Sequence, residues 1–251
     1  MREQVQGNEV KVWINGLSGR MGQILKDQVV ADKSFSFISG ASVDYFDLEV
    51  QKLDKTELVI DFSSVDGSHA LASYVNEQKS LPKQSYLICT TGLSHDTTAL
   101  WKSIAEKGHR VLLAANTSLG IYLTLQSALK IAPVAKSEGF DLVIEDSHHR
   151  YKVDSPSGTA LFLANELAAQ NKLTVKTEAG QAWSAESLPV TAVRGGGIFG
   201  EHTIRMIGDH EEISITHRAF SRELFAKGAL FLGRWLSSQK SGFYSLNDVS
   251  F

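Results

Sequence analysis

The chain has 251 residues, of which 43% are hydrophobic and 21% are charged, a balance that indicates a folded protein and excludes a disordered or fibrous one. Its 25 lysines and arginines against 28 aspartates and glutamates give a net charge of −3. No basic field over the whole chain attracts nucleic acid or anionic lipid, so any anion site must be local. We therefore expect no nucleic-acid partner.

Cysteine content and apolar runs indicate the cellular setting. The single cysteine, Cys89, excludes an intramolecular disulfide framework and a multi-cysteine zinc site, and it fits a reducing compartment. No apolar run approaches the roughly 18 to 20 residues of a membrane helix. Met1 to Val10 resemble neither a secretory signal nor a transit helix. These patterns predict a cytoplasmic protein with no membrane partner.

The first half of the chain alternates between strand and helix patterns. Val10 to Ile14 is a β-branched and aromatic run that stops at Asn15-Gly16, and helical spacing follows from Met21 to Val30. Such alternation predicts an α/β fold with a Rossmann-type parallel sheet covered on both faces. The other expected elements are strands Phe35 to Val43, Leu58 to Phe62, Tyr86 to Thr90 and Val111 to Ala115, with helices at about 66–79 and 95–107.

After about residue 118 the pattern changes. The last two of three late strands are consecutive and joined by a short turn, which predicts antiparallel pairing and a second, α+β domain with a mixed or antiparallel sheet. The expected elements are helices Ile121 to Ala135, Ser157 to Ala169 and Leu224 to Leu236, and strands Phe140 to Glu145, 190–195, 201–207 and 211–217, followed by a tail.

Three glycines follow the first strand at three-residue spacing: Gly16, Gly19 and Gly22. A tight turn with a close backbone approach and helix amides suits a pyrophosphate, although three glycines can also simply make a turn. Asp44 ends the second strand and would accept hydrogen bonds from the ribose hydroxyls of NAD, unless it is only a solvated loop acid. Arg20 could contact a phosphate. NADH is the cofactor favoured, with NADPH possible.

A basic cluster opens the second domain's helix-forming segment. His148, His149, Arg150 and Lys152 precede a turn, Asp154 to Ala160, whose Ser, Gly and Thr can donate hydrogen bonds at a helix start. This combination favours a carboxylate or phosphate site over a plain surface patch, and histidine and lysine can supply protons near neutral pH. The two histidines with Asp146 could in principle hold zinc, but adjacent rings on an extended segment diverge, so we expect no metal site.

These residues resemble the dihydrodipicolinate reductase family. The resemblance spans essentially residues 11 to 249, and its most specific part is the HHxxKxDxPSGTA segment. The other matching segments are Gly16 to Gly22, Asp61-Phe62-Ser63, Thr90-Thr91-Gly92, Ala115 to Ser118, Arg194-Gly195 through Gly200-Glu201-His202, His217 to Arg222 and Phe225 to Ala229.

The resemblance implies hydride transfer from NADH or NADPH to a cyclic imine-type dicarboxylate, giving tetrahydrodipicolinate with loss of water. It implies that His148 and Lys152 are catalytic, and that His149, Ser157, Gly158 and Thr159 bind the substrate. The cofactor contacts it implies are Gly16, Gly19, Arg20, Met21, Gly22, Asp44, Thr90, Thr91, Gly92, Ala115, Asn116, Thr117 and Ser118. It further implies a dinucleotide domain of residues 1–118 and 228–251, a substrate and oligomerisation domain of residues 119–227, and a homotetramer.

Three positions depart from the family pattern: Cys89 replaces a glycine, Thr117 an aromatic residue and Ser155 an alanine. Two alternatives therefore stay open, a different two-domain NAD-dependent dehydrogenase and a module that binds NADH and a dicarboxylate without turnover. For Glu201 and His202, shaping the turn after Gly200 is slightly favoured over ligand contact.

Overall fold

The computed structural model describes residues 9–42, 50–177 and 184–249. The chain divides into two compact units, residues 1–118 with 223–251 and residues 119–222. The second crossing comes at Glu223 and not at the expected 228, because helix α7 (Glu223–Ser237) is one continuous element whose buried face packs in the first unit. Within the described segments, no helix has the length and apolarity to cross a membrane.

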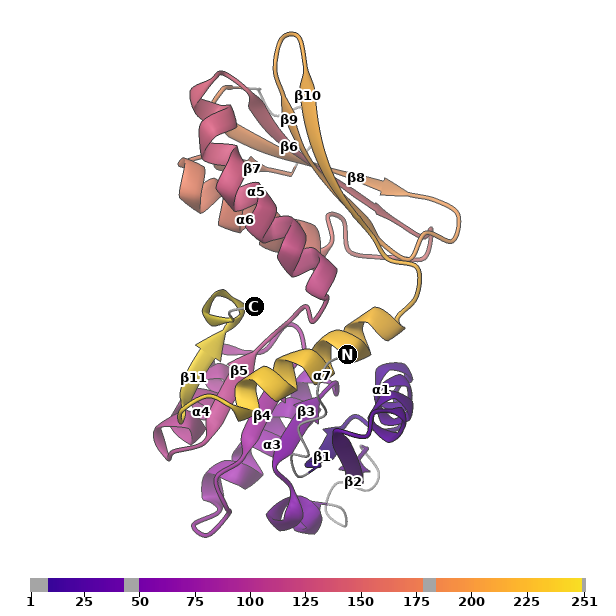
Figure 1. The fold of residues 1–251 in the computed structure, drawn as a ribbon, viewed down its shortest axis with the longest axis vertical. Coiled ribbons are helices and arrows are strands. Elements are labelled where there is room, and N and C mark those ends of the chain that lie inside the picture. Colours follow the sequence, from indigo (N-terminus) through magenta and orange to yellow (C-terminus); the bar gives the residue numbers. More distant parts are fainter. Residues whose placement is uncertain (1–8, 43–49, 178–183, 250–251) are drawn as a thin grey trace, which may run out of the picture. The chain divides into compact units, whose positions relative to one another are not determined.

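The first unit contains a parallel sheet in the order β11-β5-β4-β3-β1-β2 (Figure 1). The expected Rossmann-type sheet is thus confirmed. Its edge strand β11 lies in the segment expected to be only a tail; four residues are too few to show a periodic pattern, and pairing with β5 decides their conformation. The strands are β1 (Val10–Asn15), β2 (Phe35–Ala41), β3 (Leu58–Asp61), β4 (Ser85–Ile88), β5 (Arg110–Leu113) and β11 (Gly242–Ser245).

Alternate side chains of each strand enter opposite cores of this sheet. Val12 and Ile14 of β1 pack with α1 and α7, whereas Trp13 between them packs with α3 and α4. Helices therefore cover both faces, as the continuous apolar strands require. The helices are α1 (Arg20–Ala31), α3 (Val65–Glu77), α4 (His95–Glu106) and α7, with short 3-10 helices Val50–Lys55 and Leu246–Asp248.

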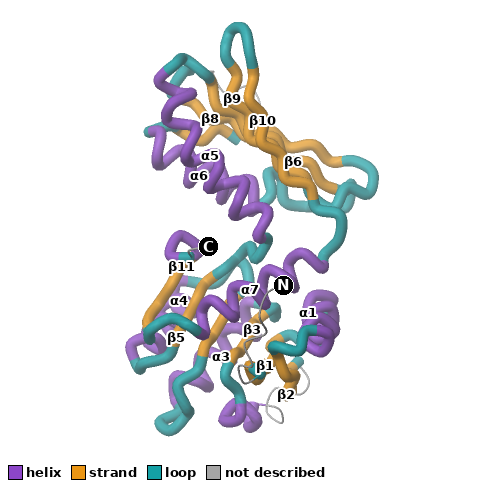
Figure 2. The backbone as a smooth tube through the Cα atoms, viewed as in Figure 1, coloured by secondary structure: helices purple, strands orange, loops and turns teal. Residues whose placement is uncertain are grey.

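The second unit has a mixed sheet in the order β10-β9-β6-β8-β7. Strands β9 and β10 pair antiparallel, which confirms that prediction, and β6 pairs parallel with β8. Helices α5 and α6 pack on one face of this sheet (Figure 2). The elements are α5 (Leu119–Ser137), β6 (Asp141–His148), α6 (Gly158–Asn171), β7 (Thr174–Lys176), β8 (Ser187–Arg194), β9 (Glu201–Ile207) and β10 (Glu212–Arg218); the short β7 was not predicted.

The core face of β6 changes from apolar to polar along the strand. Leu142 and Ile144 are buried in the core with α5 and α6, and Asp146 and His148 continue the same alternate row and are also buried. In the antiparallel register with β9, Asp146 lies opposite His202. The sheet therefore ends its hydrophobic stripe in a buried polar group beside the start of α6.

Gly22 in α1 provides a test of the glycine turn. An added Cβ there would lie 2.2 Å from the carbonyl oxygen of Gly16 and 2.7 Å from Cα of Leu17. We expect Gly22→Ala to lower the free energy of unfolding by about 1–3 kcal/mol, because overpacking against backbone outweighs the about 1 kcal/mol that alanine gains in a helix. Urea unfolding measures this. The matched control Gly19→Ala, with its nearest atom at 3.2 Å, should cost less; equal losses would contradict the packing argument.

Candidate active site

The glycine turn after β1 has the geometry of an anion-binding turn. Gly16 has a φ of +82°, and an added Cβ would meet the carbonyl oxygen of Phe62 at 2.6 Å, so only glycine fits. Gly19 is the N-cap of α1, and no described side chain caps this helix. The first amides of α1 are therefore available to a negatively charged group.

A pocket of about 560 Å³ lies against this turn. Its volume is within the range of small-molecule and cofactor sites. Of the predicted cofactor residues, Gly16 and Gly19 line it. The remaining lining residues are Asn15, Ser18 and Ser42, and, from the β3–α3 segment, Phe62, Ser63, Ser64, Asp66, Gly67 and Ala70.

Asn15 connects the two walls of the pocket. Its side-chain amide donates to Oδ1 of Asp61, to Oγ of Ser63 and to the carbonyl oxygen of Gly67, at 3.1, 3.0 and 3.1 Å. Asn15 is not among the site residues predicted from the sequence. A usable signal was present, since Asn15 and Asp61 end neighbouring parallel strands and such ends share one edge of the sheet.

The other predicted residues of the glycine turn have different surroundings. Arg20 is exposed at the first position of α1, Met21 packs partly buried against the core, and Gly22 is buried beneath the turn. None of these three residues is among those that line the pocket. The predicted ribose contact Asp44 lies outside the described residues.

The predicted loops after β4 and β5 are partly buried. Thr90 donates its hydroxyl to the carbonyl oxygen of Ser63 at 3.4 Å, and Thr117 donates to that of Phe225 in α7 at 2.7 Å. Thr117 is 3% exposed, so its hydroxyl serves packing within this unit. Of the remaining loop residues, Thr91, Gly92 and Ala115 are exposed, Asn116 is half-buried and accepts from the Ser118 amide, and Ser118 is buried.

Cys89 departs from the family pattern inside the core. It is 5% exposed, and burial raises the pKa of its thiol. The replacement therefore affects packing in the core, and a thiol buried in this way is unreactive.

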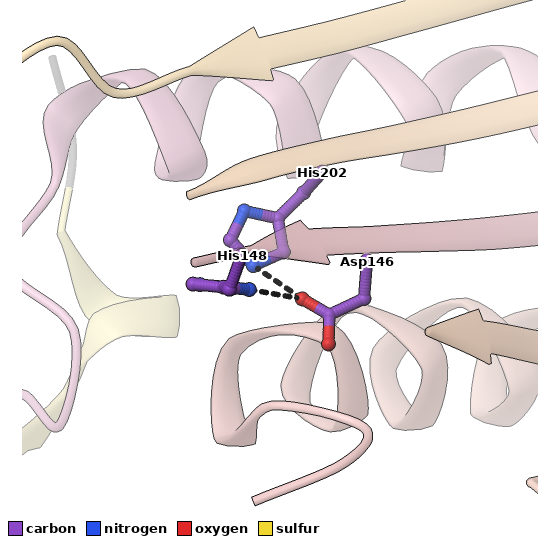
Figure 3. A group of neighbouring side chains, drawn as sticks. All are labelled: Asp146, His148 and His202. Atoms are coloured by element: carbon purple, nitrogen blue, oxygen red, sulfur yellow. Dashed lines mark ion pairs between the residues drawn. The ribbon is translucent and has the colours of Figure 1, made fainter. Parts of the chain in front are cut away.

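In the second unit, His148 lies against a buried carboxylate. Its Nδ1 is 2.9 Å from Oδ1 of Asp146, and Nε2 of His202 is 3.3 Å from the same oxygen (Figure 3). The His148 contact is close in distance without the alignment of a full hydrogen bond. The two rings meet edge-on, with centroids 5.2 Å apart.

Asp146 has further donors from two other elements. The Ser157 amide donates to Oδ2 at 2.7 Å, its hydroxyl donates to Oδ1 at 2.8 Å, and Nη2 of Arg194 donates to Oδ2 at 2.9 Å. Burial raises the pKa of Asp146, but His148, His202, Arg194 and the Ser157 amide together hold it well below its usual range. Asp146 is therefore a fixed negative charge at neutral pH. We call Asp146, His148, Ser157, Arg194 and His202 the Asp146 cluster.

Ser157 joins this cluster to the start of α6. It is the N-cap, and its hydroxyl accepts from the Ala160 amide at 3.2 Å while donating to Asp146. Gly158, the next residue, is exposed, and an added Cβ there would meet no described atom within 4 Å. The side chain of Ser157 therefore anchors the helix start to the buried Asp146, whereas the next residue, Gly158, is exposed.

Lys152 and His149 lie on the segment between β6 and α6. Nζ of Lys152 is 2.8 Å from Oδ1 of Asp154. Although burial raises it, the pKa of Asp154 is lowered by Lys152 and by the backbone amides of Asp154 and Gly158. The ammonium and the helix-start amide therefore act on one carboxylate. The His149 ring lies near that of Tyr151, with centroids 6.3 Å apart.

The Asp146 cluster includes residues that sequence reasoning did not assign. His202 does more than shape the turn after Gly200, because its ring contacts both Asp146 and Ser157. The ligand-type atoms of Asp146, His148 and His202 lie within 4.8 Å of one another, a spacing that a metal ion could use. The set considered from the sequence contained His149 in place of His202. The Arg194 cation on the same carboxylate opposes a metal there.

Ser157 allows the cluster's contribution to stability to be measured. We expect Ser157→Ala to lower the free energy of unfolding by about 2–3 kcal/mol, since about 1 kcal/mol comes from the cap and about 1–2 kcal/mol from the bond to a buried charge. Ser94→Ala is the matched control, because Ser94 caps α4 through the Thr97 amide and bonds no buried carboxylate. Its loss should be about 1 kcal/mol. Equal losses in urea unfolding would count against the coupling to Asp146.

The chain is similar to known proteins over nearly its whole length. The family model for the dihydrodipicolinate reductase N-terminus matches residues 10–117, and that for the C-terminus matches residues 120–249. The 4-hydroxy-tetrahydrodipicolinate reductase of Campylobacter jejuni subsp. jejuni serotype O:6 is 36% identical over 250 residues, covering 95% of this chain and 98% of that protein. The protein of the same name from Aquifex aeolicus is 35% identical over 265 residues, covering 96% and 98%.

Solved structures show the same fold. A dipicolinate-bound dihydrodipicolinate reductase from Paenisporosarcina sp. TG-14 superposes with a TM-score of 0.77 at 19% identity, covering 96% of this chain and 100% of that chain. A C. glutamicum DAP dehydrogenase in complex with DAP gives a TM-score of 0.55 at 11% identity, covering 97% of this chain and 95% of that chain. The family models and the similarity to the C. jejuni and A. aeolicus proteins show that the chain belongs to the dihydrodipicolinate reductase family of oxidoreductases.

Proposed function

We propose that the protein reduces 4-hydroxy-tetrahydrodipicolinate to tetrahydrodipicolinate in lysine and diaminopimelate biosynthesis. One observation carries this proposal: a buried carboxylate holds His148 beside the start of α6, on the segment that also carries Lys152. A proton donor, an ammonium and helix-start amides on adjoining residues suit an anionic substrate that must be both bound and protonated. The reductase name of the C. jejuni and A. aeolicus relatives supports this substrate.

The substrate's carboxylates are assigned to the outer side of this segment. Lys152 already pairs with the Asp154 carboxylate, so this position accepts an anion, and a substrate carboxylate would compete with Asp154 for it. We assign Thr159 and His149 to the same dicarboxylate. Ser157 contributes through the helix start that it caps.

The dinucleotide is assigned to the pocket at the glycine turn. The φ of Gly16, the absence of space for a Cβ there and the pocket of about 560 Å³ fit a pyrophosphate and its nucleoside. When bound, the nicotinamide supplies the hydride. Proton delivery falls to His148 and Lys152, with Nδ1 of His148 directed at Asp146 and Nε2 as the nitrogen that would donate, since loss of the substrate's hydroxyl as water needs a proton.

NADH is the proposed preferred donor, and NADPH remains an alternative because Asp44 lies outside the described residues. We expect a higher kcat/KM with NADH, since a carboxylate at the ribose would repel a 2′-phosphate. Steady-state rates with both nucleotides on freshly prepared product of the preceding synthase reaction measure this. A higher kcat/KM with NADPH would reject the assignment of Asp44.

We also propose a cytoplasmic homotetramer formed through the second unit's sheet. Both helices of that unit, α5 and α6, pack on the same face of the sheet, which leaves the other face uncovered by any described helix. Light scattering of the purified protein gives the assembly size, and a monomer would reject this part of the proposal.

Replacement of His148 tests the chemistry. We expect His148→Gln to lower kcat by about 100-fold or more with little change in the Kd for NADH, because general acid catalysis is lost while the dinucleotide pocket is untouched. The exposed His210→Gln, between β9 and β10, is the control and should keep wild-type turnover. Near-normal turnover of His148→Gln would refute the role. Wild-type protein that binds NADH and dipicolinate but never oxidises NADH on substrate would instead be a binding module.

A further inference from the structure

Asp146 is a buried charge with an unusual number of partners. Its side chain is 0% exposed, and it accepts hydrogen bonds from Arg194 of β8 and from Ser157 at the start of α6. Ring nitrogens of His148 on its own strand and of His202 on β9 lie 2.9 and 3.3 Å from Oδ1. A carboxylate needed only to neutralise Arg194 would be served by Oδ2, which already receives Arg194 and the Ser157 amide. The other oxygen, Oδ1, is directed at two imidazoles and the Ser157 hydroxyl. This second oxygen therefore requires an explanation beyond charge balance.

The surroundings of His148 fix its ring from two sides. Nδ1 faces Asp146, and Nε2 lies against Gly200, where an added Cβ would come within 3.0 Å of it. A carboxylate at Nδ1 favours the tautomer of a neutral ring that carries its proton on that nitrogen. The ring thus has one orientation, with Nε2 as the nitrogen left to exchange a proton.

The same oxygen also acts on the helix start. The Ser157 hydroxyl donates to Oδ1 while accepting from the Ala160 amide, so any movement of this carboxylate moves the N-cap of α6 and the ring of His148 together. His202 supports both, since its Nε2 lies 3.3 Å from Oδ1 of Asp146 and 3.2 Å from Oγ of Ser157.

We propose that Asp146 is a positioning residue. Assisted by His202, it fixes the position of the His148 ring relative to the substrate-binding start of α6. The expected effect on kcat rests on the proposed function. The expected orientation of the His148 ring does not depend on turnover. A metal ion held by the same three side chains is the competing interpretation.

The kinetic test is a double-mutant cycle between Asp146→Asn and His148→Gln in the full-length protein. We expect Asp146→Asn to lower kcat by about 10- to 100-fold, by analogy with the loss seen when the carboxylate that orients a metal-bound histidine is removed. If Asp146 acts through His148, the double variant is no slower than His148→Gln alone. A double variant whose loss of kcat equals the product of the two single losses would overturn the proposal. Glu145→Gln is the matched control, since Glu145 is the neighbouring residue and pairs with Arg205; it should keep wild-type kcat.

A spectroscopic readout separates this inference from the proposed function. In ¹⁵N-labelled protein without substrate, we expect the His148 ring to carry its proton on Nδ1, and Asp146→Asn to shift it toward a mixture of tautomers. An unchanged His148 signal would overturn the proposal even if the enzyme is active. The expected signal with no turnover would reject the proposed function and leave the positioning role intact. Stoichiometric Zn²⁺ that shifts the His148 and His202 signals together would establish the metal interpretation instead.

A second variant covers a failure of Asp146→Asn to fold. His202→Gln keeps the carboxylate and removes its second imidazole, and we expect it to lower kcat by about 10-fold, again without further loss in combination with His148→Gln. Wild-type kcat in His202→Gln, or multiplied losses in the double variant, would exclude His202 from the positioning role.

Discussion

The ionised carboxylate of Asp146 is the constraint on which the geometry of the second unit depends. A charge without solvent access costs several kcal/mol unless donors replace the lost water. Here Arg194 supplies the opposite charge, and Ser157 supplies an amide and a hydroxyl. Because these partners come from β8 and α6, the carboxylate can be satisfied only when strand, neighbouring strand and helix start are all in place. The need to satisfy the buried charge of Asp146 thus fixes the local structure around His148, the proposed proton donor.

The fold could be predicted from sequence where the periodicity was long and the connections were short. The alternation of strands and helices up to residue 118 gave the parallel sheet, and the turn between β9 and β10 gave their antiparallel pairing. Two short strands, β7 and β11, were not predicted. They have three and four residues, and their conformation comes from pairing with β8 and β5, so local sequence carries almost no signal for them.

Sequence patterns predicted only those site residues that lie on one continuous segment of the chain. Residues 148 to 160 contain the proposed proton donors and the helix start, and a motif on continuous chain can be recognised without knowing the fold. His202 and Arg194 lie on other strands, and their approach to Asp146 depends on a sheet register that no local pattern defines. One signal was available: Leu142, Ile144, Asp146 and His148 form a single row, so two polar residues continue an apolar stripe.

The first unit shows the same division between a motif and its support. The glycine turn is readable because Gly16, Gly19 and Gly22 are regularly spaced, whereas its opposite wall is held by Asn15 through bonds to Asp61, Ser63 and Gly67, more than forty residues away. In both units the recognisable segment contains the groups assigned to the ligand, and one buried polar side chain on an adjacent strand end fixes the geometry. Such a side chain bonds several backbone or side-chain partners at once, so a replacement of similar size leaves some of them unsatisfied. Asn15 and Asp146 are therefore constrained by the partners that they hold in place, and the ligand-facing residues depend on them for position.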